Sequence, residues 1–200
     1  VPPNISGFGT FISSTHAGVP VTWTLSEPFG SMEWWPCKNG LNDKADSLDM
    51  FISTPSTFRV AGNGKRISET VTGSDRMTYW KHRYAISSYQ VALSVAKFVQ
   101  YPTVPAIVNI GGTNMELYNL LWSSTNTANA HTALDRTADM LTVFSNRFSD
   151  YPFKNEKYGH YTFGFSGGME HNTFSGMGSS TYNATSDWSV IAHELGHQWF

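Results

Sequence analysis

The segment from Val190 to Phe200 constrains the fold of this chain most, because a helix there brings His193 and His197 together on one face. Apolar residues recur at steps of three and four from just before this segment to near its end. They form one stripe, which comprises Trp188, Ile191, Ala192, Leu195 and Trp199. At about 100° per residue, His193 and His197 lie on the side opposite this stripe. Thr185 or Ser186 would cap the first free N–H groups. The sequence therefore predicts an amphipathic helix that buries one face and presents two histidines on the other.

The polar face of this helix carries the pattern H-E-x-x-H at His193, Glu194 and His197. Two imidazoles one helical turn apart can bind one zinc ion, and Glu194 can then reach a water on the metal without ligating it. The alternative is a pair of polar histidines on an ordinary surface helix, and their orientation and the cap favour zinc. A catalytic zinc of this type needs a third protein ligand, which we expect downstream of Phe200.

A second motif, Ser166–His171, reads Ser-Gly-Gly-Met-Glu-His. Together with Val190–Phe200 it resembles the gluzincin aminopeptidases, the family of aminopeptidase N and leukotriene hydrolase. Their hallmarks are G-x-M-E-N on a strand edge and V-I-x-H-E-x-x-H-Q-W-F. The stretches Trp35–Ser47 and Tyr84–Tyr89 are similar to W-P-C … D-K-A-D-S and Y-x-I-x-S-Y in the β-domain of that family. His171 departs from the pattern, where asparagine is usual, and this leaves the fine specificity open.

The resemblance implies Zn²⁺ as the cofactor, held by His193, His197 and a downstream glutamate. Glu194 would take a proton from the attacking water and pass it to the leaving amine. Glu170 would bind the free α-amino group of a peptide substrate, and the alternative is a strand-end carboxylate bonded locally. For these 200 residues alone, we expect weak zinc binding and no appreciable peptidase activity.

Further substrate-binding residues are predicted around the second motif and in the first half of the chain. Gly167 and Gly168 would let a substrate backbone approach a strand edge closely, with Met169 on the same strand. His171 would donate a hydrogen bond. Glu27 matches the position at which the family's β-domain offers a second acceptor to the amine, although a surface carboxylate is an equally good interpretation.

The pattern of periodicities predicts an α+β protein in two parts. Residues 1–103 alternate as antiparallel strands, and the Pro102–Pro105 stretch suggests a boundary. Residues 104–200 change to helical spacing. With the resemblance, the predicted fold is the C-terminal part of an antiparallel β-domain followed by the N-terminal half of a thermolysin-like zinc peptidase catalytic domain. We expect the sequence to be an internal piece of a longer enzyme.

Local signals predict three further elements. Asn63–Gly64, between the apolar segments Phe58–Val60 and Ile67–Val71, predicts a tight hairpin turn. Ala130–Phe148 has helical spacing throughout and predicts a single helix. Tyr161–Phe165 alternates and predicts a strand.

Composition excludes several classes of function. The net charge of -2 gives no indication of a nucleic-acid partner, and no apolar run is long enough to span a bilayer. Cys37 is the only cysteine, so an internal disulfide and a thiolate zinc site are excluded. The sparse charge (14%) favours a secreted or surface-associated enzyme, and the oligomeric state is open. The resulting prediction is a zinc aminopeptidase acting on peptides with a free N-terminus; the alternatives are a non-catalytic, peptidase-like binding scaffold, an endopeptidase or an epoxide hydrolase.

Overall fold

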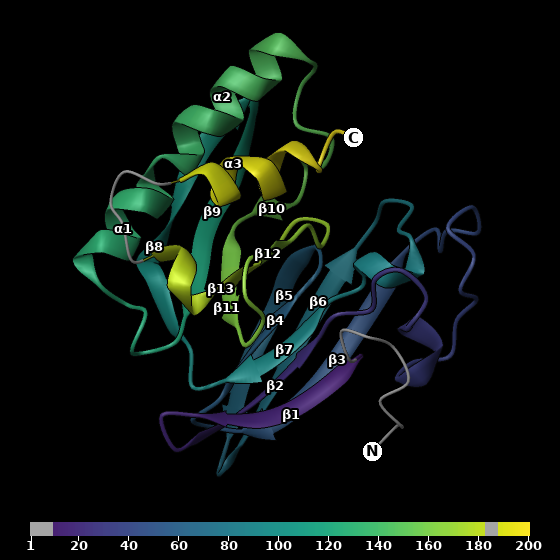
Figure 1. Ribbon diagram of the computed structural model, residues 1–200, viewed down its shortest axis with the longest axis vertical. Helices are drawn as coiled ribbons and strands as arrows, with labels where there is room; N and C mark the ends of the chain where they lie inside the picture. The colour runs from purple at the N-terminus through teal and green to yellow at the C-terminus, as the bar shows by residue number, and fades with distance from the viewer. Residues whose placement is uncertain (1–9, 183–187) are drawn as a thin grey trace. The chain divides into compact units, whose positions relative to one another are not determined.

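The computed structural model describes residues 10–182 and 188–200. They belong to two compact units, Val1–Phe98 and Val99–Phe200 (Figure 1). The combination of several sheets with a few helices confirms the α+β class. The Pro102–Pro105 stretch lies inside the first strand of the second unit, where the strand pairing is interrupted, and not between the units.

The first unit contains two antiparallel sheets. One is four-stranded in the order β1 (Phe11–His16), β2 (Val19–Thr24), β7 (Leu93–Ala96) and β4 (Arg59–Gly62). The other is three-stranded in the order β3 (Leu48–Pro55), β6 (Asp75–His82) and β5 (Lys65–Thr72). Two short 3₁₀ helices accompany them, η1 (Ser31–Glu33) and η2 (Ser88–Gln90).

The predicted hairpin at Asn63–Gly64 is wrong, because β4 and β5 on either side of it pair in different sheets. Asn63 is fully buried, and its amide donates to the carbonyl of Gln90 at 3.0 Å and accepts from the N–H of Ala92 at 2.7 Å. Gly64 has a φ of +78°, and a Cβ on it would overlap the backbone carbonyl of Lys81. These two residues therefore carry the chain from one sheet to the other instead of reversing it.

The second unit is built on one mixed sheet of six strands. They are β8 (Val99–Ile110), β9 (Thr113–Leu121), β10 (Lys157–Tyr158), β11 (His160–Phe163), β12 (Gly168–Met169) and β13 (Ser175–Gly178). β9 runs parallel to β10 and β11, β11 runs parallel to β13, and β12 pairs antiparallel with β13 at the edge. The long β8–β9 hairpin was not predicted. Its turn is Gly111–Gly112, with φ of +53° and +81°, as a two-residue type I′ turn requires.

Three α-helices lie in the described part of the second unit, residues 99–182 and 188–200. They are α1 (Ala128–Asp135), α2 (Thr137–Arg147) and α3 (Ser189–Gly196), with a 3₁₀ turn η3 (Ser179–Tyr182). The helix predicted over Ala130–Phe148 is thus two helices that meet at Arg136. The predicted caps Thr185 and Ser186 lie outside the described residues. None of the helices in the described part of the chain has the length and apolar content to cross a membrane.

Helix α3 is held by an apolar core that also contains α2 and the sheet. It contacts α2, β12 and β13 (Figure 1). The fully buried side chains of this core come from all three helices and from the strands beneath them: Met115, Leu121, Leu134, Leu141, Tyr158, Met177, Ile191 and Leu195. The core therefore fixes α3 over the edge of the sheet at which β12 lies.

Candidate metal centre

Helix α3 buries one face and exposes the histidine-bearing one, as its apolar stripe predicts. Ile191 and Leu195 are completely buried, whereas His193 is exposed and His197 is half-buried. Trp188, the first residue of the predicted stripe, is 37% exposed and precedes the first helical residue. The helix ends at Gly196, so His197 is its C-terminal capping residue.

The two imidazoles converge on one point. Nε2 of His193 and Nε2 of His197 are 3.2 Å apart, and their rings meet edge to face with centroids separated by 4.8 Å. Two nitrogens bound tetrahedrally to zinc at about 2.0–2.1 Å lie about 3.3 Å from each other. The observed spacing therefore fits one edge of a zinc tetrahedron. Within 10–182 and 188–200, no group of three histidine, cysteine or carboxylate side chains completes such a site.

Glu194 differs from the two histidines in being buried. It is only 5% exposed, and its side chain lies directly over Gly168 in β12, where a Cβ would overlap its carboxylate. Burial raises the pKa of the Tyr158 phenol; the hydrogen bond with Ser175 lowers it in part, and the nearby charge of Glu194 raises it further. The hydroxyls of Tyr158 and Ser175 are 2.9 Å apart and form a hydrogen bond. The two sequence motifs thus meet at Gly168 and Glu194.

The predicted substrate residue Glu170 directly follows β12, and His171 after it begins the four-residue turn His171–Phe174. The N–H of Phe174 donates to the carbonyl of His171 at 3.2 Å and closes the turn. Gln198 in turn donates from Nε2 to the carbonyl of Glu170 at 3.2 Å. Gln198 has no predicted role, although its place directly after the second histidine of H-E-x-x-H was a usable signal.

His160 in β11 and His171 in the turn are both fully buried and stay neutral. Burial lowers the pKa of His160 and of His171 to about 3. Nδ1 of His160 is 2.9 Å from Oδ1 of Asn119, and Nδ1 of His171 is 2.8 Å from the hydroxyl of Tyr161. The His171 ring is therefore an interior group bonded to Tyr161, and its contact with a substrate stays a prediction.

The remaining predicted substrate residues are spread over both units. Gly167 has a φ of +111°, which only glycine adopts readily, and its carbonyl accepts from the N–H of Gly178 at 2.7 Å. Met169 is 2% exposed and belongs to the interior. Glu27 is exposed in the first unit, directly before Pro28. The roles predicted for these residues in substrate binding stay predictions.

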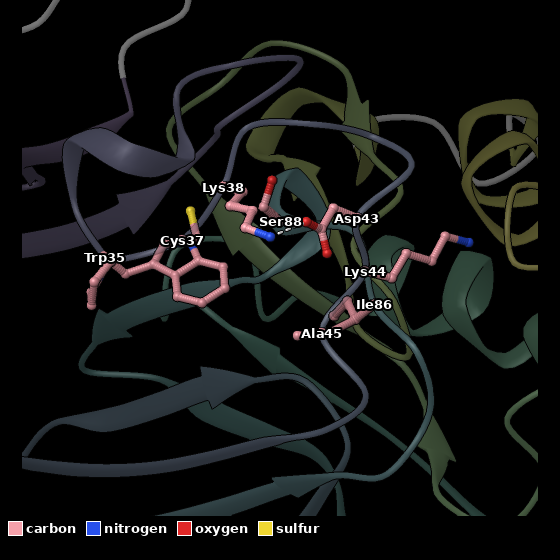
Figure 2. A pocket seen from close by; sticks show the side chains of 9 residues that line it. Trp35, Cys37, Lys38, Asp43, Lys44, Ala45, Ile86 and Ser88 are labelled. Atoms are coloured by element: carbon pink, nitrogen blue, oxygen red, sulfur yellow. Dashed lines mark hydrogen bonds and ion pairs between the residues drawn. The ribbon is translucent and has the colours of Figure 1, made fainter.

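The first unit contains a pocket of about 220 Å³, shown in Figure 2. Its lining is Trp35, Pro36, Cys37, Lys38, Asp43, Lys44, Ala45, Ile86 and Ser88. The Lys38 ammonium pairs with the Asp43 carboxylate at 2.5 Å, and Lys44 points away from both (Figure 2). Burial raises the pKa of the Cys37 thiol, which keeps it protonated and weakly nucleophilic. The pocket therefore offers a paired charge and an unactivated thiol, and the α3 site is the stronger candidate.

Comparisons with known proteins agree with this geometry at the level of fold. No family model and no curated protein matches the sequence. Among solved structures, one of a two-domain M1 zinc metallopeptidase mutant bound to L-tryptophan matches with a TM-score of 0.78 and 22% identity, over 100% of this chain and 44% of that one. The M1 zinc metallopeptidase of Deinococcus radiodurans matches with a TM-score of 0.75 and 23% identity, over 94% and 41%. This chain shares their fold.

A third structure, of a mutant two-domain M1 zinc metallopeptidase bound to L-arginine, matches with a TM-score of 0.76 and 23% identity, over 94% of this chain. The chain spans about two fifths of the length of these proteins, 41% in this case. Identities of this size establish similarity of fold, and activity has to be argued from the site.

Proposed function

We propose that this chain forms part of a zinc-dependent aminopeptidase, in which its second unit is the first half of a thermolysin-like catalytic domain. The observation that carries the proposal is the convergence of the His193 and His197 Nε2 atoms to 3.2 Å, one residue away from a buried glutamate on the same helix. The same spacing also suits a direct N–H···N hydrogen bond between two neutral imidazoles, and the buried glutamate between them in the sequence favours a metal site.

The chemistry divides between the metal and the residues of the chain. Zinc bound by His193 and His197, with a third ligand from outside this sequence, would supply a Lewis acid and lower the pKa of a water. Glu194 would act as the proton carrier, accepting a proton from the attacking water and delivering it to the leaving amine. Its burial against Gly168 restricts its rotamers and so preorganises the carboxylate for this transfer.

Recognition of the substrate would fall to β12 and the residue that follows it. β12 is the last strand of its sheet, so an extended peptide can pair with its outer edge. Glu170, which is half-buried at the end of β12, would pair with the α-ammonium group of a peptide with a free N-terminus. Structures with this fold bound L-arginine, L-tryptophan and a Tyr-Ser-Ala substrate, and free amino acids are the products that an aminopeptidase releases.

The proposal is tested in the intact protein with two variants. Glu194→Gln should abolish hydrolysis of an aminoacyl anilide while the zinc content stays at one ion per chain. Glu170→Ala should raise KM for substrates with a free amine, because the ammonium loses its partner. Equal rates on free and N-acetylated peptides would overturn the aminopeptidase assignment, and stoichiometric zinc without hydrolysis of any peptide would point to a non-catalytic scaffold.

A further inference from the structure

The turn after β12 contains an unusual backbone conformation. Thr173 is the third residue of the turn His171–Phe174 and has a φ of +67°. This position in a turn is normally taken by glycine, because a β-branched side chain at positive φ collides with its own backbone. Something outside the turn must therefore hold Thr173 in place.

Gln198 supplies the first hold, from the end of α3. Its side chain is only 4% exposed, and Oε1 accepts from the N–H of Thr173 at 2.8 Å. Nε2 donates to the carbonyl of Glu170 at 3.2 Å and lies 3.5 Å from that of His171. The amide thus bridges both ends of the turn. Because Gln198 directly follows His197, the turn cannot shift along α3 without breaking these bonds.

Lys157 supplies the second hold, from β10. Its side chain is completely buried, and Nζ donates to the carbonyl of Thr173 at 3.1 Å and lies 3.4 Å from its Oγ1. Nζ also lies 4.0 Å from the centre of the Phe174 ring, a cation–π geometry. Complete burial of an ammonium group is costly, and nothing in the proposed reaction needs Lys157. The hydrogen bonds from Nζ to Thr173 offset part of this cost.

We propose that Gln198 and Lys157 form a clamp on Thr173 that positions Glu170 relative to the two histidines of α3. Gln198 and Lys157 are positioning residues in this scheme and do not contact the substrate. The inference rests on the proposed function, which gives the position of Glu170 its importance. The N–H and the carbonyl of Thr173 are both held by buried side chains from outside the turn.

The kinetic test first removes the hydrogen bonds of Gln198 and then relieves the backbone strain at Thr173. Gln198→Met keeps the length of the side chain and loses its hydrogen bonds; we expect KM for an aminoacyl anilide to rise about tenfold, with kcat changed less than about threefold and zinc content unchanged. Thr173→Gly adopts positive φ without strain, so adding it to Gln198→Met should restore most of the lost KM. Loss of packing at Gln198 would not be rescued in this way.

A matched control is Gln100→Met on β8, which removes a hydrogen bond from Nε2 to the carbonyl of Thr103 at 2.9 Å in the same unit. It should leave KM unchanged. If Gln198→Met leaves KM unchanged as well, or lowers kcat and KM in the same proportion with no rescue by Thr173→Gly, the positioning role is wrong.

Amide hydrogen exchange separates the clamp from the proposed activity. In Gln198→Met the Thr173 amide loses its acceptor, and its exchange should accelerate by about tenfold or more relative to core amides of β11. This measurement needs no substrate. Accelerated exchange in a protein that cleaves no peptide would sustain the clamp and refute the aminopeptidase, whereas unchanged exchange would refute the clamp whatever the activity.

Discussion

Gly168→Ala is the most direct test of how the two motifs meet. Gly168 lies in β12, its φ is outside the positive region that favours glycine, and alanine fits its backbone. A Cβ there would overlap Oε1, Cγ and Cδ of Glu194, all of which belong to one side chain. The substitution therefore acts on Glu194 and spares the strand.

The magnitude follows from what must move. The overlap reaches Cγ as well as the carboxylate of a buried side chain, so all of Glu194 beyond Cβ must shift, at a cost of about 1–3 kcal/mol. Alanine recovers about 0.5–1 kcal/mol over glycine in a strand. The free energy of unfolding should therefore fall by no more than about 2.5 kcal/mol. A carboxylate displaced by about 1 Å, however, can cost about 100-fold in rate.

The assay compares kcat for an aminoacyl anilide with the zinc content and the Tm of the same preparation. We expect Gly168→Ala to lose about 100-fold in kcat, with the zinc content retained and the Tm lowered by several degrees at most. Gly196→Ala is the matched control, since its new methyl group would meet only the Phe144 ring at an ordinary 3.9 Å. If Gly168→Ala retains full kcat, the placement of Glu194 against β12 is not what prepares it for proton transfer.

Three further outcomes follow from the contacts of single residues. Burial lowers the pKa of His160 and His171 to about 3 and holds both rings neutral, so the unfolded chain takes up protons that the folded chain excludes. The free energy of unfolding should be at its full value above about pH 6.5. It should fall by up to about 1.4 kcal/mol per pH unit for each histidine as the pH drops towards 3. Urea titrations at pH 7 and pH 5 measure this, and identical midpoints would contradict it. Asn63→Ala should lower the free energy of unfolding by about 1–3 kcal/mol, because the N–H of Ala92 is left buried without its acceptor, and a change within error would show that water replaces the amide. His197→Ala should weaken zinc binding by at least about 100-fold in a chelator competition, and an unchanged affinity would place the metal elsewhere.

Helix α3 was predictable because its signals are local. The spacing of His193, Glu194 and His197 fixes their relative directions once the segment is helical, and the buried Ile191 and Leu195 make it so. The α+β class followed from periodicity in the same way. Features within one helical turn or one strand can be predicted without knowing which other elements the segment packs against.

Predictions failed where the outcome depended on distant residues. Asn63–Gly64 has the composition of a hairpin turn, but the bonds of Asn63 to a segment beyond β6 decide the path of the chain. The Gln198 clamp joins residues that are far apart in sequence, so no spacing rule detects it. By contrast, Gly111–Gly112 is a local signal from which the β8–β9 turn could have been predicted.

The shortness of β12 has a consequence for the behaviour of the protein in solution. An edge strand with many unpaired N–H and carbonyl groups is a template for the strands of other molecules and promotes aggregation. β12 has only 2 residues, Gly168 and Met169, so it offers too few groups for a second sheet to grow on. For the same reason, a peptide that pairs with β12 can form only a few backbone hydrogen bonds there, which favours weak, short-lived binding over tight binding.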